Sequence, residues 1–469
     1  MDAPSREPVV LRHAEPVTQC GNSMRGNWRP VLTLLLLSPA IGELLSGSSP
    51  PAQFFNPIAL LLLVGLYGCG ALLVRELRVR RQLNVCGLLL LGVAYGIVEE
   101  GLTCKSFFNP FWKDVGFLST YGRALGVNWL WTLGLTAYHT IVSIAVPIFL
   151  TEALFADRAA GPWLRRRGCV IAAVCLGLVT LLGFAAFDSP EFHMLEVKDP
   201  AVLANRLLEP QDPVSRFIAS QLSSKTVAIL EKSRACGTPP PELRHELVNA
   251  LNHLLPRPDL YQQEGFAGVS LPDDVLQRLT RLPHGDQLVR LNRALLESAY
   301  AQELAKRPTY PYRPPWPLTL GCVLAVAGLA AMAMRQQRQE PGTVAMAHAW
   351  RYGLAFTLVF AVLGFAVPGL VENGMRLPAV VTAGLWFVFA AIGVRILRRL
   401  DGLPGSLWLR GLWALGVLTP WSFFAILLGV VVQLQGAKSF AGMPVVALAF
   451  GIGILVLAFK WRGRLAPPI

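Results

Sequence analysis

The stretch NVCGLLLLGVAYGIVEEGLTC (residues 84–104) is a long apolar segment that carries two adjacent carboxylates, Glu99 and Glu100, near its end. An α-helix needs about 20 mainly apolar residues to cross the hydrocarbon core of a bilayer, so this segment predicts a membrane-spanning helix. A charged side chain inside a bilayer is costly and usually faces protein or water. The acidic pair therefore marks a candidate polar site.

The whole chain has the composition of a membrane protein. Of its 469 residues, 53% are hydrophobic and 15% are charged, whereas soluble domains carry about 25% charged residues. Segments that are long and apolar enough to span lie near 31–47, 57–74, 84–104, 128–152, 168–187, 317–334, 352–371, 378–396, 409–432 and 441–459. We expect an all-α, polytopic membrane protein with about ten transmembrane helices. The first segment is short and contains Pro39 and Glu43, so a re-entrant helix is its alternative.

The basic residues predict the orientation of the chain. The net charge is +13, and basic blocks occur at every second connection and at the C-terminus. These blocks are RELRVRR (75–81), RRR (165–167), RQQR (335–338), RILRR (395–399) and KWRGR (460–464). Basic connectors usually stay in the cytoplasm, so we expect both termini on the cytoplasmic side. The membrane is expected to be the cell inner membrane. The basic excess does not indicate nucleic-acid binding, because no concentrated basic patch with a reading motif occurs.

The helices and the polar segments divide the chain into five parts. We expect a cytoplasmic tail (1–29), five membrane helices (30–187), an extracytoplasmic helical domain with a Pro-rich tether (188–316), five more helices (317–460) and a cytoplasmic tail (461–469). The insert is polar and repeats apolar residues at helical spacing. Besides the lipid bilayer, it is the part expected to bind an extracytoplasmic protein partner.

Two predicted helices present polar residues to each other. Gly92, Gly96, Glu99 and Thr103 fall on one face of the third helix, where glycines allow close approach of a neighbour. The fourth helix has a stripe of polar residues along one side. Of the histidines in the sequence, only His139 falls inside one of the ten predicted spans. The stripe comprises Thr132, Thr136, His139, Thr140 and Ser143. Glu99, Glu100 and His139 are therefore candidate catalytic residues, and Thr103, Thr136 and Ser143 are candidate substrate-binding residues.

Structural explanations of the acidic pair stay open. Glu99 and Glu100 could lie at the outer interface and pair with Lys105 or Lys113, or they could form a polar knot that holds helices together. If the third helix continues to Phe108, the pair lies near mid-membrane; if it ends at Cys104, the pair lies near the surface. No cofactor is expected, and no metal site either, because CxxC pairs and HExxH spacing are absent.

A tetrapeptide that occurs twice in the sequence suggests an internal repeat. The tetrapeptide FFNP occurs at 54–57 and again at 107–110, and each copy follows an acidic residue late in a predicted helix. Many transporters contain such repeats. Four residues also match by chance, which is the alternative.

Two resemblances bear on function. The pair Glu99-Glu100 followed one helix later by His139 resembles the motifs EExxxR and FxxxH of the CPBP family of CAAX prenyl proteases and abortive-infection proteins. Here Cys104 replaces the arginine, Leu135 replaces the phenylalanine, and the third histidine motif is missing. The resemblance would imply a glutamate that activates water and a histidine that stabilises an oxyanion. The segment SPAIGELLSGSSPP (38–51) is similar to bacterial multi-pass membrane proteins of unassigned activity.

Three functions follow from these observations. The first is a membrane protein that handles or senses a small molecule through a polar intramembrane cavity. The second is an intramembrane hydrolase that uses Glu99, Glu100 and His139. The third is a scaffold whose external domain binds an envelope partner. ATP-driven transport is not indicated, because the chain has no GxxxxGK[ST] loop.

Overall fold

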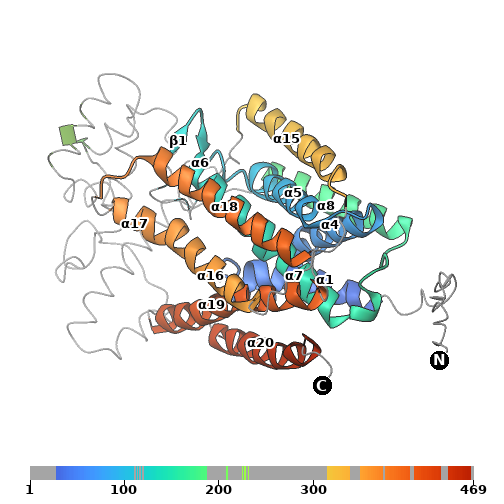
Figure 1. Cartoon of the computed structure of the whole chain (residues 1–469). Coiled ribbons are helices and arrows are strands. Elements are labelled where there is room, and N and C mark those ends of the chain that lie inside the picture. Colours follow the sequence, from blue (N-terminus) through green and yellow to red (C-terminus); the bar gives the residue numbers. More distant parts are fainter. Residues whose placement is uncertain are drawn as a thin grey trace, which may run out of the picture.

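A computed structural model describes residues 28–109, 121–186, 314–337, 349–372, 375–401, 406–434 and 442–465, with isolated positions between them. This part of the chain is a helical bundle with one short β-hairpin, β1 (Arg123–Ala124) and β2 (Val127–Asn128) (Figure 1). The expected cytoplasmic tail and nearly all of the expected domain at 188–316 lie outside the described residues.

The helices follow the apolar segments of the sequence. The longer ones are α1 (Trp28–Pro39), α3 (Pro57–Leu63), α4 (Cys69–Arg80), α5 (Val85–Gly96), α6 (Trp129–Tyr138), α7 (Val146–Leu154), α8 (Arg166–Ala186), α15 (Trp316–Met334), α16 (Ala349–Ala361), α17 (Val367–Glu372), α18 (Ala379–Asp401), α19 (Ser406–Leu434) and α20 (Met443–Leu465). Within the described ranges, nine continuous helices are long and apolar enough to cross a membrane. This confirms the prediction of an all-α polytopic membrane protein.

The first predicted span differs from the others. Helix α1 continues through the π-helical turn η2 (Ala40–Leu44) and ends there, so it is shorter than the nine spans above. Pro39 is the last residue of α1, and the helix continues past it without a break.

Wide π-helical turns interrupt several of the long helices. Besides η2, they are η3 (Val64–Gly68), η4 (Ile97–Thr103), η6 (His139–Ala145) and η11 (Val362–Ala366). Turns of this kind are rare and often occur at functional sites. Among the described residues, four of these five lie in the first half of the chain, and they contain Glu43, Glu99, Glu100 and His139.

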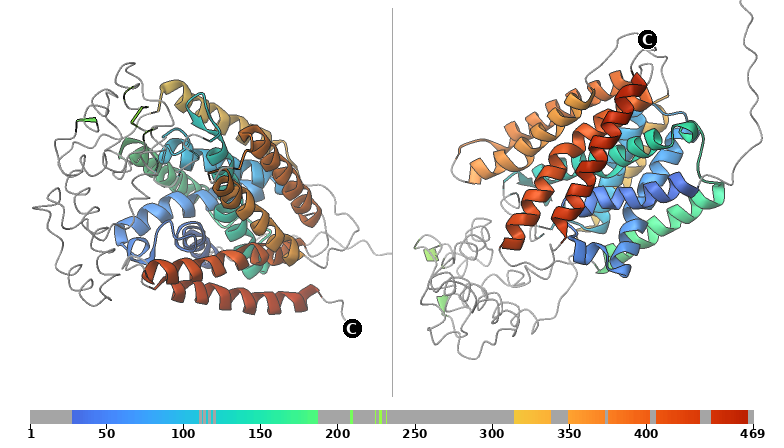
Figure 2. Two further views of the ribbon diagram at one scale, coloured as in Figure 1. Left: turned by 90° about the vertical axis from the view of Figure 1, so that its left-hand side faces the viewer. Right: turned by 90° about the horizontal axis from the view of Figure 1, so that it is seen from below.

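Two helical hairpins pack against each other at the start of the chain. The first hairpin consists of α1 with η2 and of the helix formed by α3, η3 and α4, and the second consists of α5 with η4 and of the helix formed by α6, η6 and α7. In the first hairpin, α1 packs against η3, and in the second, α5 packs against η6. The helix formed by α6, η6 and α7 is the most buried span, whereas α8, α15 and α20 lie at the edge of the bundle (Figure 2). Their exposed apolar side chains, such as Leu178, Leu324 and Leu455, form the surface expected to face lipid.

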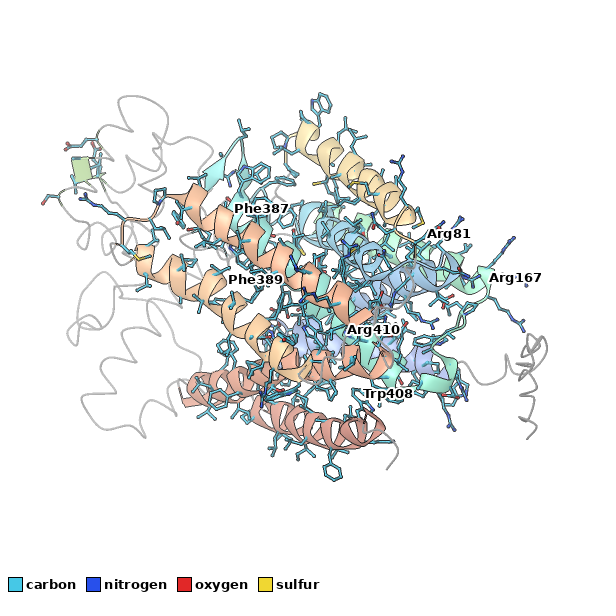
Figure 3. The ribbon with its side chains drawn as sticks, viewed as in Figure 1. Arg81, Arg167, Phe387, Phe389, Trp408 and Arg410 are labelled. Carbon is cyan, nitrogen blue, oxygen red and sulfur yellow. The ribbon has the colours of Figure 1, made fainter. Side chains whose placement is uncertain are left out.

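The basic blocks of the sequence lie at one end of the bundle. Arg80 donates to the carbonyl of Leu164, the N–H of Asn84 donates to the carbonyl of Gln336, and the ring of Trp408 packs against that of Trp461. Arg81, Arg167 and Arg410 lie toward this end of the molecule (Figure 3). The predicted alternation of basic and non-basic connectors therefore matches the helix packing.

A buried network of charges closes the same end. Glu152 of α7 lies 3.1 Å from Arg78 of α4 and 3.7 Å from Arg410 of α19, measured between side-chain N and O atoms. Asp401 of α18 pairs with the same two arginines and also accepts from the backbone N–H of Val85. The network therefore joins α4, α5 and α7 to α18 and α19.

Candidate functional site

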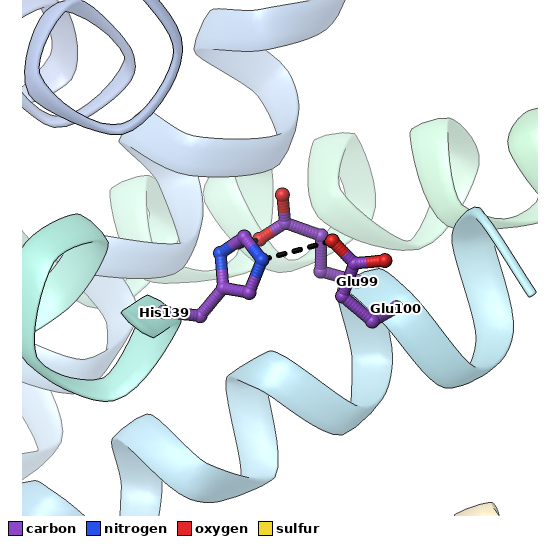
Figure 4. Close-up of side chains that lie close together, drawn as sticks. All are labelled: Glu99, Glu100 and His139. Atoms are coloured by element: carbon purple, nitrogen blue, oxygen red, sulfur yellow. Dashed lines mark hydrogen bonds and ion pairs between the residues drawn. The ribbon is translucent and has the colours of Figure 1, made fainter. Parts of the chain in front are cut away.

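The two carboxylates and the histidine meet inside the bundle. Glu99 and Glu100 lie in η4, and His139 is the first residue of η6 on the neighbouring helix (Figure 4). His139 Nε2 is 2.9 Å from Glu100 Oε1, and His139 Nδ1 is 3.0 Å from Glu99 Oε2. The carboxylates of two consecutive residues thus approach opposite nitrogens of one imidazole ring.

Neighbouring side chains hold this cluster in place. Ser143 Oγ lies 3.1 Å from His139 Nδ1, one helical turn away. Ser106 donates to the carboxylate of Glu100 and accepts from the indole N–H of Trp131, 3.0 Å away. His139, Ser143 and Ser106 are buried, as are both glutamates. The site therefore has a second layer of polar contacts that fixes the orientation of its side chains.

Small residues allow the two helices to approach closely enough for these contacts. A Cβ atom on Gly92 would lie 3.1 Å from the Cα of Thr140, and one on Gly96 would lie 3.4 Å from the Cβ of His139. The predicted glycine-lined face of the third helix therefore packs against the fourth helix. Glu99, on the same face, is brought to His139 by this packing.

The sequence left two alternatives for the third helix: an end at Cys104, with the acidic pair near the surface, or a continuation to Phe108, with the pair near mid-membrane. The structure combines features of both. The helix ends at Thr103, as the surface alternative requires. His139, however, lies ten residues into its own span, about 15 Å along the helix from Trp129. The chain after Thr103 also stays inside the protein, because Lys105, Ser106 and Asn109 are buried. The acidic pair is therefore buried in protein, and its depth in the bilayer stays a prediction.

The three predicted substrate-binding residues occupy different places. Ser143 lies in the site, beside His139. Thr103 donates to the carbonyl of Val98 in its own helix and packs its methyl group against Gly183 of α8. Thr136 is half-buried and faces Gly96 with its backbone. The role of these residues in substrate binding stays a prediction.

Sequence reasoning missed a neighbouring acid. Glu43 of η2 accepts hydrogen bonds from the hydroxyl of Tyr67 in η3 and from Ser49 Oγ, 2.6 Å away. The rings of Tyr67 and His139 have their centroids 6.1 Å apart, so the pair borders the site. In the sequence, Glu43 lies in the short first apolar segment, for which a re-entrant helix was the alternative. The repeated tetrapeptide FFNP, which follows Glu43 in one copy and Glu99 and Glu100 in the other, was the signal in the sequence that related these acids to one another.

The cluster has the composition and size of a metal site. Glu99, Glu100 and His139 each offer one ligand atom, and these atoms lie within 4.8 Å of one another. Ligands about 2.1 Å from a tetrahedral zinc ion are roughly 3.4 Å apart, so small side-chain rotations would suffice to enclose an ion. The sequence predicted no metal ligands, because these residues come from two helices and match no short ligand motif.

Comparisons with known proteins place this site within a recognised segment. Residues 32–206 match a family described as "Uncharacterized membrane protein family". The matched segment contains Glu99, Glu100 and His139, as well as Glu43 and Tyr67. The chain is thus a multi-pass membrane protein.

A curated relative and the solved structures add little to this assignment. An "Uncharacterized protein" of the archaeon Archaeoglobus fulgidus is 29% identical over 125 residues, which cover 26% of this chain and 38% of the relative. No solved structure matches. The comparisons do not show the resemblance to the CPBP family, nor do they show that the chain is bacterial.

Proposed function

We propose that this multi-pass membrane protein binds a divalent metal ion at Glu99, Glu100 and His139, and that this ion is the small ligand it handles within the membrane. The observation that carries the proposal is the convergence of two carboxylates and one imidazole within 4.8 Å in the buried part of the bundle. Three protein ligands leave coordination positions open for water or another ligand, as in catalytic and transport sites.

The ligand types favour a first-row transition metal. Imidazole nitrogen suits zinc, iron and copper, whereas carboxylate oxygen suits manganese and magnesium, so a mixed set favours Zn²⁺, Fe²⁺ or Mn²⁺. A ligating histidine usually keeps a polar partner on its other ring nitrogen. Here Nε2 lies beside Glu100, whereas Nδ1 lies beside both Glu99 and Ser143, so an ion at Nε2 leaves Nδ1 with polar partners.

The charge of the cluster supports a bound cation. Glu99 and Glu100 bring up to two negative charges, and within the described residues their basic partner at ion-pair distance is His139. Uncompensated charge is expensive to bury, and either a cation or protonation removes the excess. Metal binding and protonation therefore make different predictions, which a binding measurement separates.

The test uses the purified full-length protein in detergent, stripped with a chelator and dialysed against Zn²⁺ at neutral pH. Elemental analysis should find about one ion per chain, held by three protein ligands and water. Glu100→Gln and His139→Gln should lose this ion. Asp157→Asn, which removes an exposed carboxylate, should retain it. Equal zinc content in the wild type and the two site variants would overturn the proposal.

We place the basic end of the bundle in the cytoplasm of an inner membrane, since basic connectors favour that side. A hydrolase that uses Glu99, Glu100 and His139 is not favoured, because no comparison supports it. The scaffold alternative depends on residues 188–316, most of which lie outside the described chain.

A further inference from the structure

Exposed arginines gather where α4 and α8 meet at the basic end of the bundle. Arg81 follows the last residue of α4, and Arg166 and Arg167 are the first two residues of α8. All three side chains are exposed, and Figure 3 shows Arg81 and Arg167 at the same end of the molecule. Arg80 donates to the carbonyl of Leu164, so the two segments that carry these arginines are in direct contact. We call Arg81, Arg166 and Arg167 the arginine surface.

The acids at this end of the bundle do not balance the charge of the arginine surface. The side chains of Glu76, Glu152 and Asp401 are at most 8% exposed, and each forms ion pairs with other arginines. Asp157 is exposed and pairs with Arg158. Within the described ranges, no carboxylate lies at ion-pair distance from the arginine surface. Three positive charges are therefore presented there without an acidic partner from the described chain.

The arginine surface lies where the headgroups of a bilayer are expected. Helix α8 is apolar, and only Ala172 is buried among its 21 residues, so most of its sides are expected to contact lipid. A helix of that length extends about 31 Å, which matches the thickness of the hydrocarbon core. The first two residues of α8 are therefore expected at the headgroup level.

The connection between α7 and α8 is fixed to the end of α4. The guanidinium of Arg75 lies 3.6 Å from the centre of the Trp163 ring, and it donates to the carbonyl of Ala159, 2.8 Å away. Glu76 accepts from the backbone N–H of Trp163, 2.7 Å away, and from Nε of Arg80, 3.1 Å away. A surface built on fixed segments loses less conformational entropy when it binds a ligand.

We propose that the arginine surface binds the phosphate headgroup of an anionic phospholipid whose acyl chains lie along the exposed side of α8. Guanidinium groups bind phosphate oxygens through paired hydrogen bonds, and basic residues beside membrane helices attract anionic lipids. Val170 and Ile171 lie one helical turn after Arg166 and Arg167, and they are 62% and 64% exposed. This apolar contact suits a lipid and offers nothing to a free phosphate ion. The inference is independent of the proposed metal site.

The test counts the lipids that remain bound to the purified full-length protein in detergent, by native mass spectrometry. Phosphatidylglycerol and phosphatidylcholine with the same acyl chains are added separately, so that the two lipids differ in headgroup charge. The wild type should retain phosphatidylglycerol in preference. Arg166→Gln combined with Arg167→Gln should weaken this binding roughly tenfold or more, the scale expected for two arginines beside an anionic headgroup. Arg81→Gln should weaken it in the same direction and serves if the double variant does not fold.

A matched control separates a specific surface from a general effect of charge. Arg398→Gln combined with Arg399→Gln removes two exposed arginines from the last turn of α18 and should leave the binding unchanged. Equal weakening by the two double variants would overturn the proposal, as would equal retention of the two lipids by the wild type. Displacement of phosphatidylglycerol by inorganic phosphate at constant ionic strength would assign the arginine surface to a free anion and would also overturn it.

Discussion

Glu152 shows how a single buried acid holds several helices. Its carboxylate lies 3.6 Å from Arg75 Nε and 3.1 Å from Arg78 Nη1, and Arg410 approaches the same oxygen as Arg78. Arg78 and Arg410 also lie over the ring of Phe149. A buried charge that loses its partner is strongly destabilising, so the arginines depend on this residue.

We expect Glu152→Gln to lower the free energy of unfolding by about 3–5 kcal/mol, because the buried arginines lose a negative charge. Asp157→Asn, five residues later, removes an acid that is 72% exposed and pairs with Arg158, and it should cost less than about 1 kcal/mol. Denaturant unfolding of the detergent-solubilised proteins measures both. Equal stability of the two variants would contradict the role of the network.

At the scale of elements, α16 and α19 meet through two glycines. A Cβ atom on Gly353 would lie 2.0 Å from the carbonyl oxygen of Trp413, and one on Gly416 would lie 2.1 Å from that of Trp350. No side chain fits in either place, so the helix axes approach as closely as backbone contact permits.

Gly353→Ala should therefore force the two helices apart and cost roughly 1–3 kcal/mol or more, the range for overpacking. The matched control is Gly177→Ala in α8, where no atom lies within 4 Å of the added Cβ. That variant should keep or slightly raise the melting temperature, since alanine favours a helix. Thermal unfolding followed by circular dichroism measures both, and a stable Gly353→Ala would contradict the close contact.

The wide turns also explain which parts of the site the sequence predicted. Hydropathy and helical spacing predicted nine of the ten expected segments as spans and singled out Glu99, Glu100 and His139 as candidates, but they left open whether the acidic pair meets the histidine. Thr103 was expected on the same face as Glu99, but η4 changes the spacing between them, and Thr103 faces Gly183 of α8. Glu43 could not be placed from the sequence, because its contact with Tyr67 depends on how two helices pack.

At the scale of the whole molecule, the bundle has two chemically different ends. The turn between β1 and β2 lies before α6, and the basic block at 165–167 lies beyond α7 at the other end of the same long helix. Leu125 in that turn is 89% exposed, and Arg167 is also exposed. These two positions therefore report the orientation of the chain in the membrane.

A membrane-impermeant maleimide should label Leu125→Cys on intact cells and should label Arg167→Cys only after the cells are made permeable, because basic connectors favour the cytoplasm. The background is a variant in which the eight native cysteines are replaced by serine. The opposite labelling pattern would reverse the proposed orientation. Labelling of both positions from outside would contradict the membrane-spanning path of α6 and α7.

The wide turns have a consequence for how the chain tolerates change in length. Each turn of this kind contains one residue more than the regular helix, and one residue corresponds to about 100° of rotation. Loss of a single residue from η4 or η6 would therefore be absorbed by a return to a regular turn, which keeps the following side chains on the same side of the axis but removes the wide turn that carries the site residues. The width of these turns, and not only residue type, is thus part of the information that specifies the site.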